Sequence, residues 1–257
     1  MSPSAPAATT SAHAAAAAAK SFYPLRYFFT PYCPFAHRSS IALHEVGLLT
    51  SIEPGSQSNG QLEVVHIDIR NKPDWYLRDI NPKGKVPTLE ITTGGKKEIM
   101  IESALIAEFV LQTHGSPIAI MQSTADDAML RYRAGLVIDA LSNQFNPGYF
   151  GLLREKDPSK QPAAKDKFLD AVKAVQAVLS HGGDYATGSR FTIADVIGAP
   201  FVARLPVLEH YRGFVVPDTP EYARFHAWKR ALLARESVKA TTAEMGWLIE
   251  QNKVNAV

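Results

Sequence analysis

The order of apolar patterns changes near residue 115, and that change limits the folds this chain can adopt. Before residue 115, short β-branched and aromatic runs alternate with helical patterns. Their order is strand, helix, strand, helix, strand, strand, helix, which predicts an α/β layer on a mixed four-stranded sheet. After residue 115, every long pattern has helical spacing. We therefore predict an α/β domain followed by an all-α helical bundle domain.

Short segments predict the individual elements. Strands are expected at LRYFF (25–29), EVVHIDI (63–69), VPTLEI (86–91) and KKEIMI (96–101). Helices of the first half are expected at 33–48, 72–80 and 103–114. Helices of the second half are expected at 126–145, 163–181, from TIADV at 192, at 221–235 and around GWLIEQ at 246–251.

Composition divides the chain into four regions. Residues 1–21 are rich in Ala, Ser, Thr and Pro, which predicts a disordered tail, with organelle targeting as the alternative. Residues 22–115 form the predicted α/β domain. Residues 116–125 show no periodicity and are predicted to be a linker, and residues 126–257 form the predicted helical domain.

Charge and cysteine content exclude several classes of protein. The formal net charge of +2 over 257 residues is too small to indicate nucleic acid or an anionic membrane as the main partner. No apolar run has the length of a membrane span. The single cysteine excludes an internal disulfide and favours a reducing compartment, for which we predict the cytoplasm.

That single cysteine lies in FFTPYCPFAHRSS, where Cys33 is followed directly by Pro34. If Cys33 is the N-cap of the first helix, Pro34 occupies the first helical position, which suits proline. The amides of Phe35 and Ala36 then point toward the sulfur and favour thiolate over thiol. We therefore expect a lowered pKa and a nucleophilic Cys33. The alternative is a small, buried, apolar cysteine.

Position 36 is alanine, so there is no C-x-x-C motif and no second cysteine to resolve a disulfide. An adduct on Cys33 must then be cleared by an outside thiol, of which glutathione is the abundant one in a reducing cell. The eight histidines show no metal-ligand spacing, so no metal is expected.

Four motifs occur in order: FTPYCPFAHR, NKPDW, NPKGKVPTLEI and ESALIAEF. Together they resemble the cysteine-type glutathione transferases, most closely the omega class. The resemblance implies a thioredoxin-like glutathione-binding domain followed by a helical domain that forms the pocket for the second substrate. The loop IEPGSQSNGQ, residues 52–61, is longer than the usual connection and is interpreted as an insertion.

The resemblance also implies residues that bind glutathione. Val86 would precede a cis-proline, Pro87, and pair through its backbone with the cysteinyl part of glutathione. Glu102 and Ser103 would hold the ammonium and carboxylate of the γ-glutamyl end. The alternatives are a tight turn and an ordinary helix cap.

Lys72 corresponds to a lysine that omega relatives direct toward the glycyl carboxylate of glutathione, and Lys85 is a second candidate. A solvated surface lysine is the alternative for each. His37 is interpreted as a packing or surface histidine rather than a base. The segment from Thr192 to Asp195 is predicted to be a capping box with a role in folding.

Three aromatic residues, Tyr149, Phe150 and Trp247, are candidates for the second-substrate pocket or for the core. The implied activity is glutathione-dependent thiol transfer and reduction, including reduction of dehydroascorbate, with a small electrophilic or oxidised second substrate. A homodimer is implied as well. The alternatives are a non-catalytic binder of glutathione or hydrophobic ligands, and a membrane-inserting relative of the intracellular chloride channels.

Overall fold

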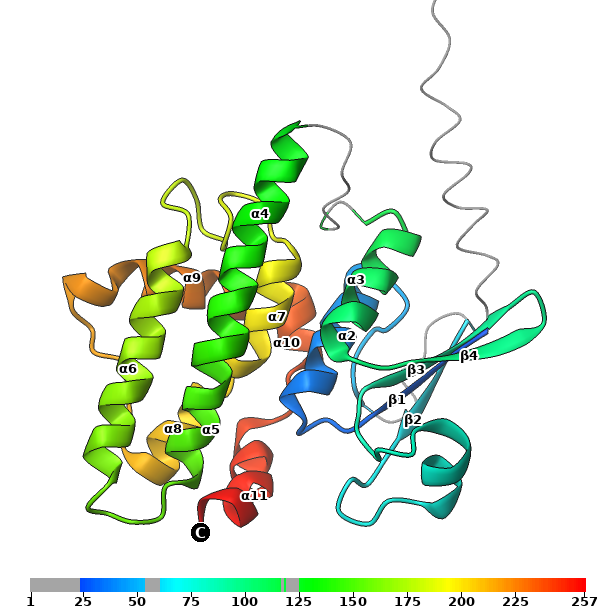
Figure 1. Ribbon diagram of the computed structural model, residues 1–257, viewed down its shortest axis with the longest axis horizontal. Coiled ribbons are helices and arrows are strands. Elements are labelled where there is room, and N and C mark those ends of the chain that lie inside the picture. Colours follow the sequence, from blue (N-terminus) through cyan, green and yellow to red (C-terminus); the bar gives the residue numbers. More distant parts are fainter. Residues whose placement is uncertain (1–23, 54–60, 117, 119–124) are drawn as a thin grey trace, which may run out of the picture.

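The computed structural model describes residues 24–53, 61–116, 118 and 125–257, and Figure 1 shows two halves side by side. The first half holds a four-stranded sheet in the order β2-β1-β3-β4. Its strands are β1 Leu25–Phe29, β2 Leu62–His66, β3 Thr88–Thr93 and β4 Lys96–Met100. β1 pairs with β2 in parallel, and the other pairs are antiparallel. The predicted mixed sheet is therefore confirmed.

Strand β1 buries residues on both of its faces. Tyr27 and Phe29 share one face, with ring centroids 5.0 Å apart. The Tyr27 hydroxyl donates a 2.6 Å hydrogen bond to the carbonyl of Ala36, in the first turn of helix α2, Pro34–Glu45. Phe28 lies on the other face, 5.5 Å from the ring of Tyr76. The strand therefore fixes the start of α2, where Cys33 lies.

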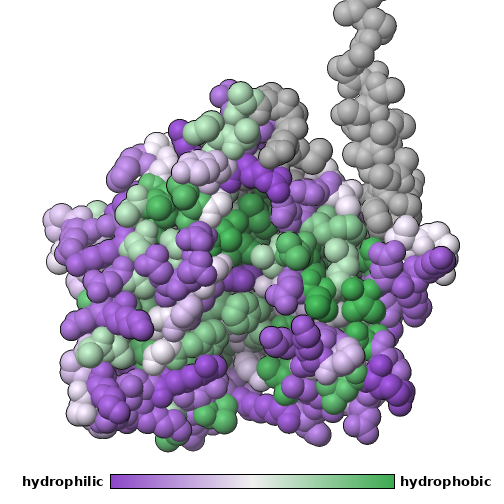
Figure 2. Space-filling view, viewed as in Figure 1, coloured by the Kyte–Doolittle hydropathy of each residue, from purple (hydrophilic) through white to green (hydrophobic). Residues whose placement is uncertain are grey.

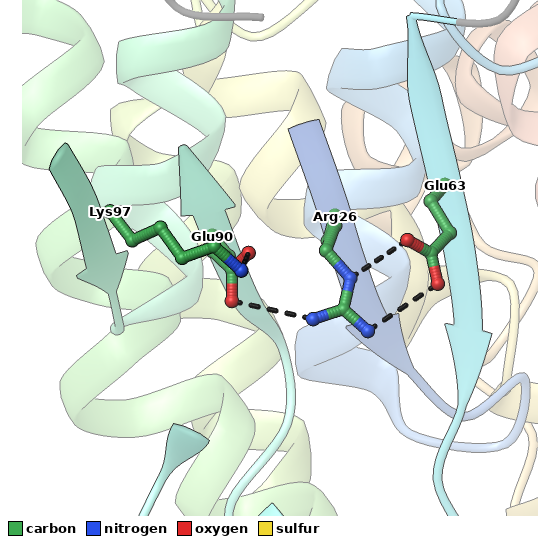
Figure 3. Close-up of polar contacts among 4 residues, drawn as sticks. All are labelled: Arg26, Glu63, Glu90 and Lys97. Atoms are coloured by element: carbon green, nitrogen blue, oxygen red, sulfur yellow. Dashed lines mark hydrogen bonds and ion pairs between the residues drawn. The ribbon is translucent and has the colours of Figure 1, made fainter. Parts of the chain in front are cut away.

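A row of charged side chains crosses the sheet (Figure 3). Arg26 on β1 forms ion pairs with Glu63 on β2 at 2.8 Å and with Glu90 on β3 at 3.4 Å. Glu90 also pairs with Lys97 on β4 at 2.9 Å. Charges of alternating sign thus join all four strands and favour this register over one shifted by a residue.

Helix α2 lies between the sheet and the helical half (Figure 1). It packs against α3, Ser103–Thr113, in its own half. It also contacts α7, Ile193–Val202, and α10, Glu236–Thr241, in the other half. The helix that carries the cysteine at its start is therefore held from both halves.

The second half consists of helices and helical turns. They are α4 Ala125–Ala140, a π-helical turn Leu141–Phe145, α5 Asn146–Arg154, α6 Gln161–Val178, α7, α8 Leu205–Arg212, a 3-10 turn Pro220–Tyr222, α9 Ala223–Ala234, α10 and α11 Met245–Ala256. The predicted fold class, a thioredoxin-like domain followed by a helical domain, is confirmed.

Three of these helices, α5, α8 and α10, have no counterpart in the sequence prediction. They have nine, eight and six residues, which is too few turns for an apolar stripe to stand out. The single helix predicted for 126–145 ends at residue 140 and continues as the π-helical turn.

The predicted capping box at the start of α7 is present. The buried Asp195 carboxylate accepts hydrogen bonds from the backbone of Thr192 at 2.9 Å, from Ala186 at 2.8 Å and from the indole of Trp228 at 2.8 Å. These contacts tie three segments of the helical half together. The predicted tail, residues 54–60 of the predicted insertion and most of the predicted linker lie outside the described residues.

Candidate active site

A cavity of about 430 Å³ opens beside Cys33 at the end of the sheet. Its lining includes all six residues that the sequence singled out: Cys33, Lys72, Lys85, Val86, Glu102 and Ser103. Phe35, Ile69, Asn81, Lys83, Gly84, Pro87 and Ile101 complete it. Four separate segments therefore bring the motifs together. The volume lies in the range of about 300–1,000 Å³ of small-molecule sites.

Cys33 is the N-cap of α2, with Pro34 in the first turn, as the sequence predicted. The Val86–Pro87 peptide bond is cis, as the resemblance implied. The Val86 carbonyl lies 3.7 Å from the Cys33 sulfur, which donates its proton to that oxygen. The nucleophile and the backbone segment expected to bind a peptide thus face each other.

The expected lowering of the Cys33 pKa is wrong for the described structure. Burial raises the pKa of this thiol, because an apolar surrounding penalises the thiolate. The backbone amides of Ala36 and Phe35 act in the opposite direction, as predicted, but do not outweigh burial. Two cations, Arg204 and Arg38, also favour the thiolate.

These two arginines are functional candidates that the sequence reasoning missed. Arg204 is almost fully buried and donates to the carbonyl oxygens of Pro200 at 2.9 Å and Pro31 at 3.1 Å. Arg38 is buried as well and donates to the Ile197 carbonyl at 3.1 Å. Burial lowers the pKa of each guanidinium to about 10. Neither forms an ion pair with a carboxylate of the described residues, so no such carboxylate neutralises the two positive charges that favour the Cys33 thiolate.

The two arginines differ in the signal that the sequence carries for them. Arg38 follows Cys33 on the same helix and lies within the FTPYCPFAHR motif, but nothing in the sequence indicates that this arginine is buried. Arg204 comes from the helical half, 171 positions after Cys33, and only the packing of the two halves places it near the thiol.

Arg38 also orients the hydroxyl of Ser103. Its guanidinium donates to Ser103 Oγ at 3.3 Å. Since that oxygen accepts from Arg38, its own proton is free to be donated to another acceptor. The serine therefore presents a donor toward the cavity that it lines.

Glu102 occupies a strained backbone conformation beside Ser103. Its φ is +70°, the only positive φ of a residue other than glycine in the described part of the chain. Such conformations cost about 1–3 kcal/mol and concentrate at functional sites. Glu102 is exposed and directly precedes α3, and both Glu102 and Ser103, the first residue of α3, line the cavity.

Three lysines, Lys72, Lys83 and Lys85, lie along the same cavity. Lys72 is half-buried, whereas Lys83 and Lys85 are exposed. None of the three appears in an ion pair within the part of the chain that the structure describes. The cavity thus has an excess of positive charge, which suits a ligand that carries carboxylates.

His37 is a buried packing residue, in agreement with the interpretation from sequence. Its Nε2 lies 3.0 Å from Thr241 Oγ1, and its Nδ1 lies 2.9 Å from the Arg204 guanidinium. Burial, with a smaller effect of Arg204, places its pKa well below the ordinary value. A neutral histidine turned toward these partners does not serve Cys33 as a base.

The three aromatic candidates have different surroundings. Tyr149 belongs to the core and donates to the Arg204 carbonyl at 3.2 Å. Phe150 is half-buried and stacks on Phe35, a cavity-lining residue, at 6.3 Å. Trp247 is 39% exposed, and its ring lies 6.5 Å from that of Tyr32, which precedes Cys33. Phe150 and Trp247 therefore remain candidates for contact with a second substrate.

Within the described ranges, no group of three or more His, Cys, Asp or Glu residues has the arrangement of a metal site. No helix of these ranges is long and apolar enough to span a lipid bilayer.

Comparison with known proteins gives matches in both halves. Residues 32–113 match the model of the glutathione S-transferase N-terminal domain, and residues 139–231 match that of the C-terminal domain. A probable cytosolic glutathione S-transferase DHAR1 from Oryza sativa subsp. japonica is 27% identical, over 87% of this chain and 91% of the relative. Glutathione S-transferase omega-1 from Sus scrofa is 23% identical, over 86% of this chain and 81% of the relative.

Solved structures of glutathione transferases also resemble this chain. The crystal structure of glutathione transferase Omega 2C from Trametes versicolor has a TM-score of 0.72 and 29% sequence identity. The match covers 91% of this chain and 100% of that chain.

Proposed function

Because the chain belongs to the glutathione S-transferase family, we propose that it is an omega-like, glutathione-dependent thiol transferase and reductase that uses Cys33 as its nucleophile. One observation carries the proposal. The chain's only thiol faces a cavity whose lining offers partners for each part of a glutathione molecule. Glutathione is the co-substrate, and the second substrate is a small electrophilic or oxidised molecule.

Each end of glutathione has a partner in this proposal. The γ-glutamyl ammonium pairs with the Glu102 carboxylate, and the γ-glutamyl carboxylate accepts from the Ser103 hydroxyl and from amides at the start of α3. The cysteinyl backbone pairs with Val86, as an added strand would. Lys72, with Lys85 as the second candidate, holds the glycyl carboxylate.

The first chemical step transfers glutathione to the protein. Cys33 loses its proton to solvent, and the thiolate attacks the glutathione sulfur of a mixed disulfide substrate. The Cys33–glutathione disulfide forms as the substrate's own sulfur–sulfur bond breaks, and the released substrate thiolate takes up a proton. The positive charges of Arg204 and Arg38 stabilise the attacking thiolate.

The second step restores the free thiol. The thiolate of another glutathione attacks the sulfur of the bound glutathione, so that oxidised glutathione leaves and the Cys33 thiolate returns. With dehydroascorbate as substrate, two glutathione molecules supply two electrons, and the products are ascorbate and oxidised glutathione. An external thiol is required because the chain has no second cysteine.

The variant Cys33→Ser tests the proposal. Serine is a good N-cap, so the variant should fold. Thiol transfer from a mixed disulfide and reduction of dehydroascorbate should fall to background, whereas conjugation of an aryl halide should stay level or rise. Oxidised glutathione should add one glutathionyl group to the parent, detected by mass spectrometry, and none to the variant. Retained thiol transfer in Cys33→Ser would overturn the mechanism.

The same preparation separates the alternatives. A parent that binds glutathione tightly but turns over none of these substrates would be a binding protein. Association of the oxidised parent with lipid vesicles would support the membrane-inserting alternative.

We also propose that the protein is a cytoplasmic homodimer. A cytoplasmic location supplies the glutathione that must re-reduce Cys33. Five large side chains on and beside α3 and α4 are exposed: Ile101, Leu105, Met129, Tyr132 and Leu136. Figure 2 shows apolar surface on the face where α3 and α4 lie. A second copy on this face would bury them. Light scattering of the parent and of Leu105→Glu tests the dimer, which the charge should dissociate.

A further inference from the structure

Lys72 lies against the backbone of Gly84 at one side of the cavity. A Cβ atom on Gly84 would come within 2.7 Å of Lys72 Cδ, within 2.9 Å of Lys72 Nζ and within 2.9 Å of Leu77 Cδ2. Non-bonded carbon atoms prefer a separation of about 3.5–4.0 Å, so these approaches are too close. The Lys72 stem and the tip of Leu77 therefore occupy space that any larger residue at position 84 would fill.

Contacts on both sides hold the turn that contains Gly84. The Gly84 amide donates to the Asn81 carbonyl at 2.8 Å, and the Lys83 amide donates to Asn81 Oδ1 at 3.1 Å. The next carbonyl, that of Lys85, accepts from Asn81 Nδ2 at 2.9 Å and from the Tyr76 hydroxyl at 2.7 Å. These contacts hold the turn in place, whereas the ends of the Lys72 and Leu77 side chains can shift by rotation about their side-chain bonds. A side chain at position 84 would therefore displace the Lys72 stem and the Leu77 tip rather than the turn.

We propose that Gly84 is a positioning residue for glutathione. Because Gly84 has no side chain, the Lys72 stem can pass across the turn, and this path places the Lys72 ammonium where the glycyl carboxylate binds. The inference rests on the function proposed above and adds the residue that places its cation. Lys72 is half-buried and without an ion-pair partner among the described residues, so its three N–H donors are available to a carboxylate. Holding the stem in advance reduces the entropy lost when the ligand binds.

The variant Gly84→Ala tests this role. The methyl group should push Lys72 out of place and raise the Kd for glutathione by about tenfold, the loss expected for one hydrogen bond between charged groups. kcat at saturating glutathione should stay near the parent value, because Cys33 is untouched. Glutathione monoethyl ester, in which the glycyl carboxylate is blocked, should bind the parent and the variant equally.

Gly94 offers a matched control. Its φ is +56°, close to the +59° of Gly84, but no atom lies within 4 Å of a Cβ at that position. Gly94→Ala therefore carries the same backbone strain without displacing Lys72 or Leu77. It should lose thermal stability through that strain alone and keep the parent's affinity for glutathione.

A double-mutant comparison separates the possible failures. Lys72→Ala should weaken glutathione binding about as much as Gly84→Ala, and adding Gly84→Ala to Lys72→Ala should cause no further loss.

If Gly84→Ala binds glutathione like Gly94→Ala while Lys72→Ala binds it weakly, the positioning role is overturned and the proposed function stands. If Gly84→Ala weakens the ester and glutathione alike, or still acts in the Lys72→Ala background, Gly84 has only a structural role. If Lys72→Ala binds glutathione like the parent, the assignment of Lys72 itself fails, and the inference with it.

Discussion

The guanidinium of Arg204 donates a hydrogen bond of 2.9 Å to Nδ1 of His37, and this contact fixes the protonation of the histidine. Arginine only donates, so Nδ1 must accept and the proton must lie on Nε2. From Nε2 it is donated to Thr241 Oγ1, at 3.0 Å. His37 is therefore a neutral acceptor that helps to hold a buried cation near the Cys33 thiol, and it has no free site for a proton from the cysteine.

Replacing Arg204 should make Cys33 less reactive. Arg204→Met keeps the length of the side chain but removes the charge that favours the thiolate. The rate of alkylation by iodoacetamide at neutral pH should fall by about tenfold, the effect of about 1.4 kcal/mol of lost thiolate stabilisation. The pH dependence of that rate should move toward higher pH.

Arg212→Met is the control for that variant. Arg212 is also buried in the helical half and donates to several backbone carbonyls, but it does not act on the Cys33 pKa. Its loss should reduce stability and leave the alkylation profile in place. If both variants shift the profile equally, the effect comes from loosened packing and not from the charge of Arg204.

Glutathione binding should itself activate Cys33. In the free protein the thiol donates to the Val86 carbonyl, which favours the protonated form. In the proposed complex the cysteinyl amide of glutathione donates to the Val86 carbonyl in place of the Cys33 thiol, which then has no acceptor there. A glutathione analogue with alanine in place of cysteine should therefore lower the pKa of Cys33, measured from thiolate absorbance with Cys33→Ser as the blank. An unchanged or raised pKa in the complex would show that Val86 does not couple binding to acidity.

Glu102 should lower the stability of the fold through its strained backbone and strengthen glutathione binding through its carboxylate. Glu102→Gly removes the strain of a φ of +70° and should raise the free energy of unfolding by about 1 kcal/mol. It also removes the carboxylate proposed for the γ-glutamyl ammonium, so glutathione should bind about tenfold or more weakly. Glu102→Gln keeps the strain but loses the charge, and should weaken binding without the gain in stability. Weakened folding in the glycine variant would mean that the conformation is not strained.

Glu45 should stabilise the contact between the two halves in a pH-dependent way. It accepts from Arg235 at 2.7 Å and 2.8 Å and from Ser237 at 2.5 Å. Burial raises the pKa of Glu45, but these donors outweigh it, and the pKa lies below the ordinary value. A carboxyl group with a depressed pKa stabilises the fold above its unfolded pKa of about 4.3, and that contribution is lost as the pH falls through the folded pKa.

Glu45→Gln should therefore lower the free energy of unfolding by about 1.5–3 kcal/mol at neutral pH, and the difference from the parent should shrink in acid. Urea unfolding at several pH values measures this. Glu63→Gln, which weakens the half-exposed pair with Arg26, should cost less than about 1 kcal/mol and serves as the control. A difference that does not depend on pH would show that the Glu45 charge has no part in the stability.

Local signals in the sequence were sufficient to predict the sheet, the change to an all-helical second half and the place of Cys33 at the start of a helix. Alternating and helical spacings depend on neighbours a few residues apart, as does the preference of proline for the first turn. The other cavity residues were expected only because the motif segments resemble those of a known family, and the structure brings those segments together around one cavity.

Only the tertiary structure decided the electrostatics around Cys33. Two local amides favour the thiolate and predict a lowered thiol pKa, but burial outweighs them and raises the pKa. The counteracting charge of Arg204 comes from the helical half, and the space for Lys72 depends on a glycine 12 positions further along the chain. Desolvation and charge–charge interactions depend on distance in space and on the depth of burial, and neither quantity exists until the two halves have packed.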